Sequence, residues 1–515
     1  MRSRVAPGPV PAAAEAVGTQ RLYTVVAACA VLVYLGALWN RFAFDDVYIV
    51  VRNPFLRVPG AWWRAFGEPY WRGALIAEMY RPLTISTFAM DRLIGGPAWF
   101  HAVNIAWHAA ASVGVAVLGR RWVGSQGGLV AGLLFAVHPV HVEAVANIVG
   151  RNELMASGFT LLAVYAALER RSPSWSAVAL LVALLSKENA AVTPGLITWA
   201  WLLGIGRPDR RKMVLFVASW VLVGATYGVA RWAVLHPYAG WHSVAPVFNR
   251  EGPLDARLTA IAALGDVARL LLFPLHLRAD YSPLERTAVH TPLNLRFLLG
   301  AMLLVAWGVL VRIAWRRGRP LEALGLGWIG IAYLPVANFL FPVGIFVAER
   351  TLYLPSAGLA VAVGAYLQNL PRRFLAVILG TVLVLCGVRT ALRVPVWRDD
   401  RTVARSLLRD APWSYRSHNY SAWQFYSAGY VERALDSWLL AGRIYDRDPD
   451  IFLAGAMAAY SLRQPRLADS LLTLADRACL YCPMEYRSIA GLARERGDSL
   501  AADSLLARAA RLRKP

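Results

Sequence analysis

The sequence predicts an all-α membrane protein in which a bundle of transmembrane helices is followed by a polar helical domain. Of its 515 residues, 57% are hydrophobic and only 17% are charged. With a mean hydropathy of +0.44, the chain is too apolar over most of its length for a soluble enzyme. Long apolar runs recur from residue 21 to about residue 391, and the chain then becomes rich in Asp, Arg and Ala. We therefore expect two parts.

About eleven segments are expected to cross the membrane as helices, several of them short. If the N-terminus is cytoplasmic, the basic clusters between these segments all fall on the cytoplasmic side. Topology thus accounts for the net charge of +22. The basic residues form no single stripe or recognition helix, so no nucleic-acid partner is expected. The expected spans are residues 21–39, 98–119, 124–140, 152–169, 173–188, 190–206, 212–230, 295–314, 320–341, 351–370 and 373–391.

Two apolar stretches differ from the ordinary spans. Leu22–Trp39 is longer than a signal-peptide core and lacks a small-residue exit, so we expect an uncleaved first span behind a cytoplasmic tail. Leu258–Leu275 carries Asp266 and Arg269 and is expected to be interfacial or re-entrant. The predicted parts are the tail at 1–20, the membrane domain at 21–395, a linker at 396–412 and an extracytoplasmic domain at 413–515.

The extracytoplasmic domain carries a 34-residue repeat. Small residues recur at three offsets, and a large apolar residue follows the same period. This pattern is typical of tetratricopeptide repeats, in which small side chains let paired helices approach closely, and the array presents a concave surface suited to a protein or peptide. The first-helix positions of the repeat are poorly kept. The recurring residues are Ala422, Ala456 and Ala490; Ala434, Ala468 and Ala502; Ala441, Ala475 and Ala509; and Trp438, Leu472 and Leu506.

Polar motifs gather on the extracytoplasmic side of the predicted topology. ATP and nucleotide sugars are normally confined to the opposite side, so a transferase working there would need an activated donor carried by a lipid. The motifs are FDD at 44–46, YRPLT at 80–84, HPVHVEAVANIVGR at 138–151, SKEN at 186–189, RADYSP at 278–283 and FPVGIFVAER at 341–350.

These motifs carry a family likeness. FDD, HPVHVEAVANIVGRNELMA, SKEN, LFPLHLRADYS and ANFLFPVGIFVAERTLYLPSAG, followed by the repeats, resemble the transmembrane and tetratricopeptide-repeat O-mannosyltransferases of the GT-C glycosyltransferase superfamily and their bacterial relatives. The likeness implies a GT-C-like bundle in a bacterial inner membrane. It also implies transfer of a sugar, mannose in the characterised members, from a polyprenyl phosphate to a Ser or Thr of a translocated protein. This chain has about three repeats, where those members carry many.

An alcohol that attacks an anomeric carbon needs a base to take its proton, and a phosphate leaving group needs cations. The resemblance assigns acceptor activation to the acid pair Asp45 and Asp46. Adjacent side chains of an extended segment point to opposite faces, so one acid can be catalytic while the other orients the loop, and we favour Asp45 as the base. The pair can instead mark a solvated loop edge or cap a helix at Val47.

Lys187, Arg350 and Arg151 are the candidates to bind the donor phosphate. Lys187 is one of only three lysines in the chain and is flanked by apolar segments. A compact ammonium suits a phosphate oxygen, whereas the alternative is a snorkelling residue paired with Glu188. Arg350 and Arg151 lie at predicted helix boundaries, and each can instead form a salt bridge with a nearby acid.

The remaining polar residues of these motifs are expected to contact substrate. His138 and His141, with Glu143 beyond them, admit a metal site, but the spacing is weakly specific and hydrogen bonds to substrate or to neighbouring loops are preferred. The sequence therefore leaves open whether the site binds a divalent cation. Cys479 and Cys482 favour a local disulfide or two inert thiols over zinc. The other expected substrate-binding residues are Arg81, Glu188, Asp280, Tyr281 and Glu349.

Two alternatives use the same chain differently. The acceptor of the enzyme can be a lipid or a glycan instead of a protein. The chain can also be a non-catalytic assembly factor, in which the bundle is an anchor and the repeats recruit envelope proteins. An anchor needs no acids or lysine at membrane depth, which favours the enzyme. The sequence leaves the sugar, the acceptor and the oligomeric state open.

Overall fold

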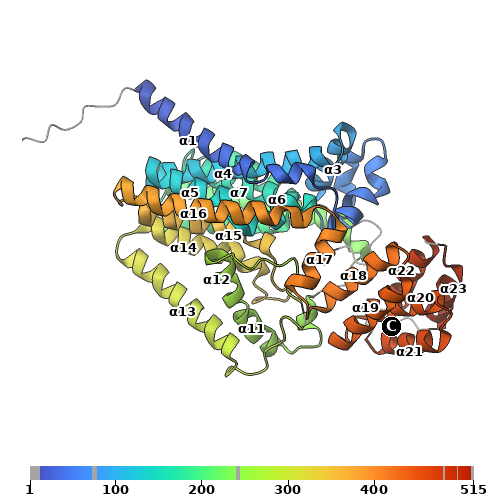
Figure 1. Ribbon diagram of the computed structural model, residues 1–515. Coiled ribbons are helices and arrows are strands. Elements are labelled where there is room, and N and C mark those ends of the chain that lie inside the picture. Colours follow the sequence, from blue (N-terminus) through green and yellow to red (C-terminus); the bar gives the residue numbers. More distant parts are fainter. Residues whose placement is uncertain are drawn as a thin grey trace, which may run out of the picture.

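The computed structural model describes residues 12–71, 78–238, 244–282, 284–478, 482–495 and 497–511. All regular elements in these ranges are helices (Figure 1), which confirms the predicted all-α class. The first part of the predicted tail, residues 1–11, and Cys479 of the predicted cysteine pair lie outside the described residues.

Within the described ranges, five segments are long and apolar enough to cross a membrane, and the chain is accordingly an integral membrane protein. A sixth span results if the bent helix pair Ser125–Val137 and Pro139–Ala146, which meet at 47°, crosses as one unit. The predicted count of about eleven is not confirmed, because the other predicted spans form shorter or more polar helices. The five segments are Gly18–Trp39, Pro97–Val123, Arg210–Tyr238, Leu295–Arg316 and Arg373–Trp397.

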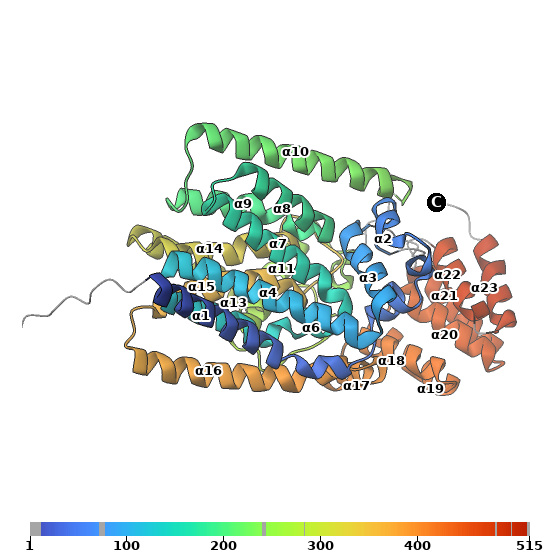
Figure 2. The ribbon, with the colours of Figure 1, turned by 90° about the horizontal axis from the view of Figure 1, so that it is seen from above.

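Long helices flank shorter apolar ones, and the long α4 lies among the latter. Seen from above, α10 and α16 run along opposite sides of the bundle, with α4 and α7 between them (Figure 2). The long elements are α1 (Ala12–Leu32) with η1 (Leu35–Trp39), α4 (Pro97–Val123), α10 (Arg210–Leu235) with η8 (His236–Tyr238), α13 (Leu295–Arg316), and α16 (Arg372–Arg393) with η12 (Val394–Trp397). The shorter ones are α5 (Ser125–Val137), α7 (Arg151–Leu168), α8 (Pro173–Ser186), α9 (Thr193–Leu202), α14 (Pro320–Tyr333) with η10 (Leu334–Val336), and α15 (Tyr353–Leu367).

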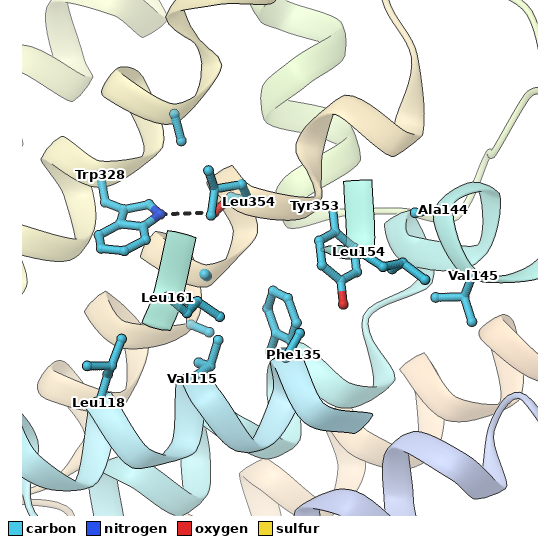
Figure 3. Packing of buried hydrophobic residues seen from close by; sticks show 14 of the residues in the cluster. Val115, Leu118, Phe135, Ala144, Val145, Leu154, Leu161, Trp328, Tyr353 and Leu354 are labelled. Carbon is cyan, nitrogen blue, oxygen red and sulfur yellow. Dashed lines mark hydrogen bonds between the residues drawn. The ribbon is translucent and has the colours of Figure 1, made fainter. Parts of the chain in front are cut away.

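The core of the bundle lies where α4, α5, α7, α14 and α15 meet. Small residues permit the close approach of α14 and α15, since a Cβ added at Gly325 would lie 2.5 Å from the carbonyl oxygen of Gly358. Large side chains fill the rest of the core (Figure 3), where the indole N–H of Trp328 donates a hydrogen bond to the carbonyl oxygen of Leu354 at 3.0 Å. This packing fixes the helix ends from which the site residues project.

The connections between these helices are largely helical as well. The predicted interfacial stretch Leu258–Leu275 breaks into α11 (Pro253–Ala262) and α12 (Leu264–Leu272), each too short to span. The long first loop forms η2 (Val47–Val51), η3 (Pro54–Arg57), α2 (Ala61–Arg64), η4 (Ala65–Gly67) and α3 (Pro82–Ile94). The other connecting elements are η5 (Pro139–His141), α6 (Val142–Ala146), η6 (Ile148–Gly150), η7 (Glu188–Val192), η9 (Pro246–Phe248) and η11 (Glu349–Leu352).

Three helix pairs with their own core follow at one end of the bundle (Figure 1). The predicted linker contains α17 (Asp400–Asp410), which packs against the first of them. All nine recurring alanines are buried in this core, as close pairing of the helices requires; the assignment as tetratricopeptide repeats stays a prediction. The pairs are α18 (Tyr415–Ser427) with α19 (Val431–Ile444), α20 (Pro449–Ser461) with α21 (Pro465–Ala478), and α22 (Cys482–Glu495) with α23 (Ser499–Arg511).

Candidate active site

The two adjacent acids after η1 have different surroundings. Asp46 is buried, and its carboxyl group accepts main-chain N–H bonds from Val149 at 2.8 Å and from Ala43 and Ile148 at 3.3 Å each. Burial raises the pKa of Asp46 to about 8, and the three N–H donors act in the opposite direction. Asp46 therefore ties the first loop to the segment that precedes α7, which is a positioning role.

Asp45 is only partly buried, and among the described residues its carboxylate accepts no hydrogen bond and joins no ion pair. Burial raises the pKa of Asp45, while the nearby Arg350 guanidinium lowers it and the Glu143 carboxylate raises it. A carboxylate without a protein partner and with a raised pKa is suited to accept a proton from a substrate. The structure thus distinguishes two acids that the sequence left nearly equivalent.

The residue before Asp45 has an unusual backbone conformation. Phe44 has a φ of +59°, which bulky residues rarely adopt and which persists only where the surroundings enforce it. Its main-chain N–H donates to Oδ1 of Asp400 at 2.8 Å, and its ring packs against Trp397 and Tyr420 at centroid distances of 6.2 and 5.1 Å. The Tyr420 hydroxyl donates to the same Asp400 oxygen at 2.8 Å. Contacts from η12, α17 and α18 therefore hold the backbone that presents Asp45.

Arg350 of η11 faces Glu143 of α6. Its main-chain N–H donates to Oε2 of Glu143 at 2.9 Å, and its Nη1 pairs with Oε1 of the same carboxylate. Nε and Nη2 have no partner among the described residues, and the side chain remains 21% exposed. Glu143 thus fixes one edge of the guanidinium and leaves the other free to bind an anion.

Two more ion pairs lie close to these groups. Arg81 forms a two-pronged pair with Glu188, with distances of 2.9 Å from Nε and 2.5 Å from Nη2. Lys187 pairs with Glu153, not with Glu188 as the sequence alternative has it, and both side chains are 5% exposed. Because Lys187 is enclosed and already paired, it is less available to a ligand than Arg350.

A cavity of about 320 Å³ opens between the bundle and the C-terminal helix pairs, within the size range of small-molecule sites. Phe44, Arg350 and Asp280 line it from the bundle, while Arg416 and Asp448 line it from α18 and the start of α20. The wall carries charges of both signs. The cavity therefore lies between the helix pairs on one side and, on the other, Arg350 and Phe44, the residue that precedes the candidate base.

Three predicted substrate-binding residues lie at or behind this wall. Asp280 and Tyr281 line the cavity, and Oδ2 of Asp280 accepts a hydrogen bond from the Ser414 hydroxyl at 2.6 Å. Glu349 is buried, and its Oε1 accepts from the Tyr281 hydroxyl at 3.1 Å. Burial raises the pKa of Glu349 to about 7, against the lowering effect of Arg393. Asp280 and Tyr281 can reach a ligand directly, and Glu349 supports them.

Arg151 does not face the cavity. Its side chain is fully buried and pairs with Asp91. Its Nε donates to Oδ1 of Asn104 at 2.8 Å and its Nη2 to the carbonyl oxygen of Phe100 at 3.0 Å. All of its nitrogens are therefore engaged inside the protein, and the predicted phosphate contact of Arg151 does not agree with its position.

The two predicted histidines are also enclosed. Nε2 of His141 lies 2.7 Å from the Ser356 hydroxyl, and Nε2 of His138 lies 3.0 Å from the carbonyl oxygen of Leu271. With Glu143 bound to Arg350, the three residues do not converge on one point. The sequence left open a metal site or hydrogen bonds to substrate or to neighbouring loops. In the structure both histidines form hydrogen bonds to neighbouring elements.

The described residues place one group of possible metal ligands elsewhere, at Glu251, Asp255 and His290. Nδ1 of His290 lies 2.9 Å from a carboxylate oxygen of Asp255, and Arg447 pairs with Glu251 at 3.2 Å. His290 and Arg447 already contact these carboxylates, and these contacts account for the group.

Sequence reasoning missed Asp400, Arg416 and Tyr420. Asp400 belongs to the predicted linker, which was expected only to connect the two parts. Arg416 and Tyr420 belong to the first helix of the predicted repeats, which were expected to bind the acceptor. The sequence did contain an indication, because the first-helix positions of the repeat are poorly kept. Such a departure from a structural pattern is expected where residues serve a functional site.

Comparison with known proteins gives distant relatives, although no family model matches the chain. The chain is 27% identical over 505 residues to protein O-mannosyl-transferase TMTC3 of Mus musculus, covering 88% of this chain and 54% of the relative. It is 29% identical over 448 residues to protein O-mannosyl-transferase TMTC4 of Mus musculus, covering 73% and 60%. The chain is thus a distant relative of these transferases and spans somewhat more than half of their length.

Two solved structures align with the chain at low similarity. ArnT from Cupriavidus metallidurans, bound to undecaprenyl phosphate, aligns with 14% identity and a TM-score of 0.42, covering 94% of this chain and 77% of that one. The Archaeoglobus fulgidus oligosaccharyltransferase tethered to an acceptor peptide aligns with 13% identity and a TM-score of 0.39, covering 72% and 55%.

Proposed function

We propose that this distant relative of the protein O-mannosyl-transferases is an integral-membrane glycosyltransferase of the GT-C type. It transfers a hexose, mannose in the relatives' names, from a polyprenyl phosphate to a hydroxyl group of an exported protein. The reaction takes place on the extracytoplasmic side. The observation that carries the proposal is the unpartnered Asp45 carboxylate near Arg350, whose Nε and Nη2 are free, with Phe44 and Arg350 lining a cavity of about 320 Å³.

The proposed reaction is a single displacement at the anomeric carbon. The acceptor oxygen forms a bond to that carbon, its proton passes to Asp45, and the bond from the carbon to the phosphate oxygen breaks. The polyprenyl phosphate leaves with the electron pair, and the configuration at the carbon inverts. Nε and Nη2 of Arg350 donate hydrogen bonds to the phosphate as its negative charge grows. Stabilisation of developing charge by fixed groups of this kind is usually the largest single contribution to the rate.

The surroundings support these two roles. Asp46 fixes the loop through three main-chain hydrogen bonds, and Asp400 holds the strained residue that precedes Asp45. Glu143 orients Arg350 from the opposite side. Fixed groups of this kind need no rearrangement when charge develops, which is what makes them effective. Lys187 and Arg81 add positive charge nearby, and each is paired with a glutamate.

The cavity also favours a polypeptide acceptor. One wall is formed by α18 and the start of α20, which carry Arg416, Tyr420 and Asp448. A peptide lying along the helix pairs would bring a Ser or Thr hydroxyl to the cavity. The helix pairs would then contribute to acceptor binding and to the support of the base.

The test is a comparison of cells that lack the gene with cells complemented by the wild type, by Asp45→Asn, or by Asp436→Asn, which makes the same change at an exposed position. Glycoproteomics should find hexosylated Ser and Thr peptides with the wild type and Asp436→Asn only. Loss of a glycolipid without loss of glycopeptides would refute the protein acceptor. Full complementation by Asp45→Asn would refute the catalytic assignment.

A further inference from the structure

A second cavity, of about 300 Å³, lies at the end of α16 that adjoins α17. It shares no lining residue with the cavity beside Asp45. Its wall is strongly basic, since four of the ten residues that line it are arginines and one is an acid. The charged residues of this arginine cavity are Arg278, Arg389, Arg393, Arg409 and Asp410.

The donors of the arginine cavity are only partly used. Arg393 is 2% exposed, and its Nη1 pairs with Asp410 at 2.9 Å, while its Nε and Nη2 are buried without a hydrogen-bond partner among the described residues. Arg389 uses Nε to donate to the carbonyl oxygen of Leu275 at 2.9 Å, and its two terminal nitrogens have no partner in the described chain. Unsatisfied donors on a buried guanidinium are costly unless an anion or water completes them.

The nearby acids, Asp410, Glu285 and the buried Glu349, are fewer than the four arginines of the cavity. Asp410 is shared between Arg393 and Arg409, and Arg278 pairs with Glu285 at 2.6 Å. Arg389 has no acidic partner among the described residues. Positive charge therefore remains in excess beside a cavity that is large enough for a phosphate group.

The position of the cavity indicates where the anion comes from. Arg389 and Arg393 lie four residues apart, on one face of α16, near the end of the apolar segment Arg373–Trp397. Apolar side chains that are mostly exposed flank them on α16, at the end of α12 and on the chain after it. Such side chains at the end of a membrane span face lipid, and basic residues at this depth attract lipid head groups. The flanking residues are Leu385, Val388, Leu392, Leu272, Phe273 and Leu275.

We infer that the arginine cavity binds the phosphate head group of an anionic membrane lipid, with the hydrocarbon chain along the flanking apolar residues. Arg389 and the free nitrogens of Arg393 donate hydrogen bonds to the phosphate oxygens. The site is separate from the one proposed for the sugar donor, and the inference does not depend on glycosyl transfer. Free phosphate has the same head-group chemistry, so the experiment must distinguish the two.

The test is native mass spectrometry of the purified full-length protein in detergent, titrated with phosphatidic acid and, as a zwitterionic control, phosphatidylcholine. Wild type should bind phosphatidic acid preferentially. Arg389→Gln should weaken that binding about fivefold, as expected for one basic residue near a lipid surface. Arg398→Gln removes the same charge at an exposed position outside the cavity and should leave the affinity unchanged.

Two further comparisons complete the test. Arg350→Gln, which removes the cation of the proposed donor site, should retain phosphatidic acid binding, and inorganic phosphate at equal concentration should not displace the lipid. Equal affinities of Arg389→Gln and the wild type would overturn the inference. Equal losses in Arg389→Gln and Arg398→Gln would do so as well. Displacement by equimolar inorganic phosphate would overturn the lipid assignment.

Discussion

Replacing each acid of the first loop by asparagine should give opposite phenotypes. Asp45 has no protein partner in the described chain, so Asp45→Asn removes a proton acceptor and leaves the packing intact. Asp46 accepts three main-chain N–H bonds with its two carboxyl oxygens. Asp46→Asn substitutes an amide nitrogen, which cannot accept, for one of these oxygens. We therefore expect a catalytic defect from the first change and a folding defect from the second.

The magnitudes follow from these contacts. Loss of a general base lowers the rate by about 10²- to 10⁴-fold, equivalent to about 3–5 kcal/mol of activation free energy. Asp46→Asn leaves one of the N–H groups of Val149, Ala43 and Ile148 without an acceptor in a buried site. An unsatisfied buried donor costs about 1–3 kcal/mol of unfolding free energy.

The assay combines two measurements on the purified proteins. The first is the initial rate of transfer of labelled hexose from a polyprenyl-phosphate donor to a membrane extract of cells that lack the gene. The second is the melting temperature in the same detergent. Asp45→Asn should lose the rate and keep the melting temperature, and Asp46→Asn should melt at a lower temperature. If Asp45→Asn retains the full rate while Asp46→Asn loses it without a change in melting, the assignment of the base is wrong.

Three other predictions concern charges around the site. The rate should fall with decreasing pH at a pH above the ordinary carboxyl pKa of about 3.9, because burial raises the pKa of Asp45 and a base works only when it is deprotonated. Arg416 lowers the pKa of Asp45, so its removal should move this fall in rate to higher pH. Asp400→Ala removes the acceptor that holds the backbone before the base and should lower the turnover rate about tenfold, on the scale of one lost hydrogen bond, with less effect on KM. Asp91→Asn leaves the buried Arg151 without its counter-charge and should destabilise the protein by about 3–5 kcal/mol in chemical denaturation; unchanged stability would show that the pair contributes nothing.

The positions of the helices could largely be predicted from the sequence. Each of the eleven expected spans overlaps a helix, because uninterrupted apolar runs leave the backbone few alternatives. The number of crossings could not be derived in the same way. Helices such as α9, with 10 residues, and α8, with 14, are apolar because the bundle buries them, and composition does not distinguish burial in protein from burial in lipid.

The site could be predicted in part for a related reason. The family resemblance identified Asp45 as a site candidate, and Arg350 and Glu143 were identified as charges in polar motifs next to apolar spans. It could not predict that Glu143 binds Arg350, 207 positions away, or that Arg151 is enclosed by α3 and α4. Pairings of this kind depend on which helix ends meet in space. Asp400 was missed because it acts through hydrogen bonds to the backbone of a distant loop and to Tyr420.

The most direct test of the central claim is a choice between two donors. The purified protein would be given labelled mannose either on a polyprenyl phosphate or on a nucleotide, with the same acceptor extract and with Asp45→Asn as the inactive control. We predict transfer from the lipid-linked donor only, and its loss in Asp45→Asn. Transfer from the nucleotide-linked donor in the absence of lipid, or transfer that survives in Asp45→Asn, would contradict the account.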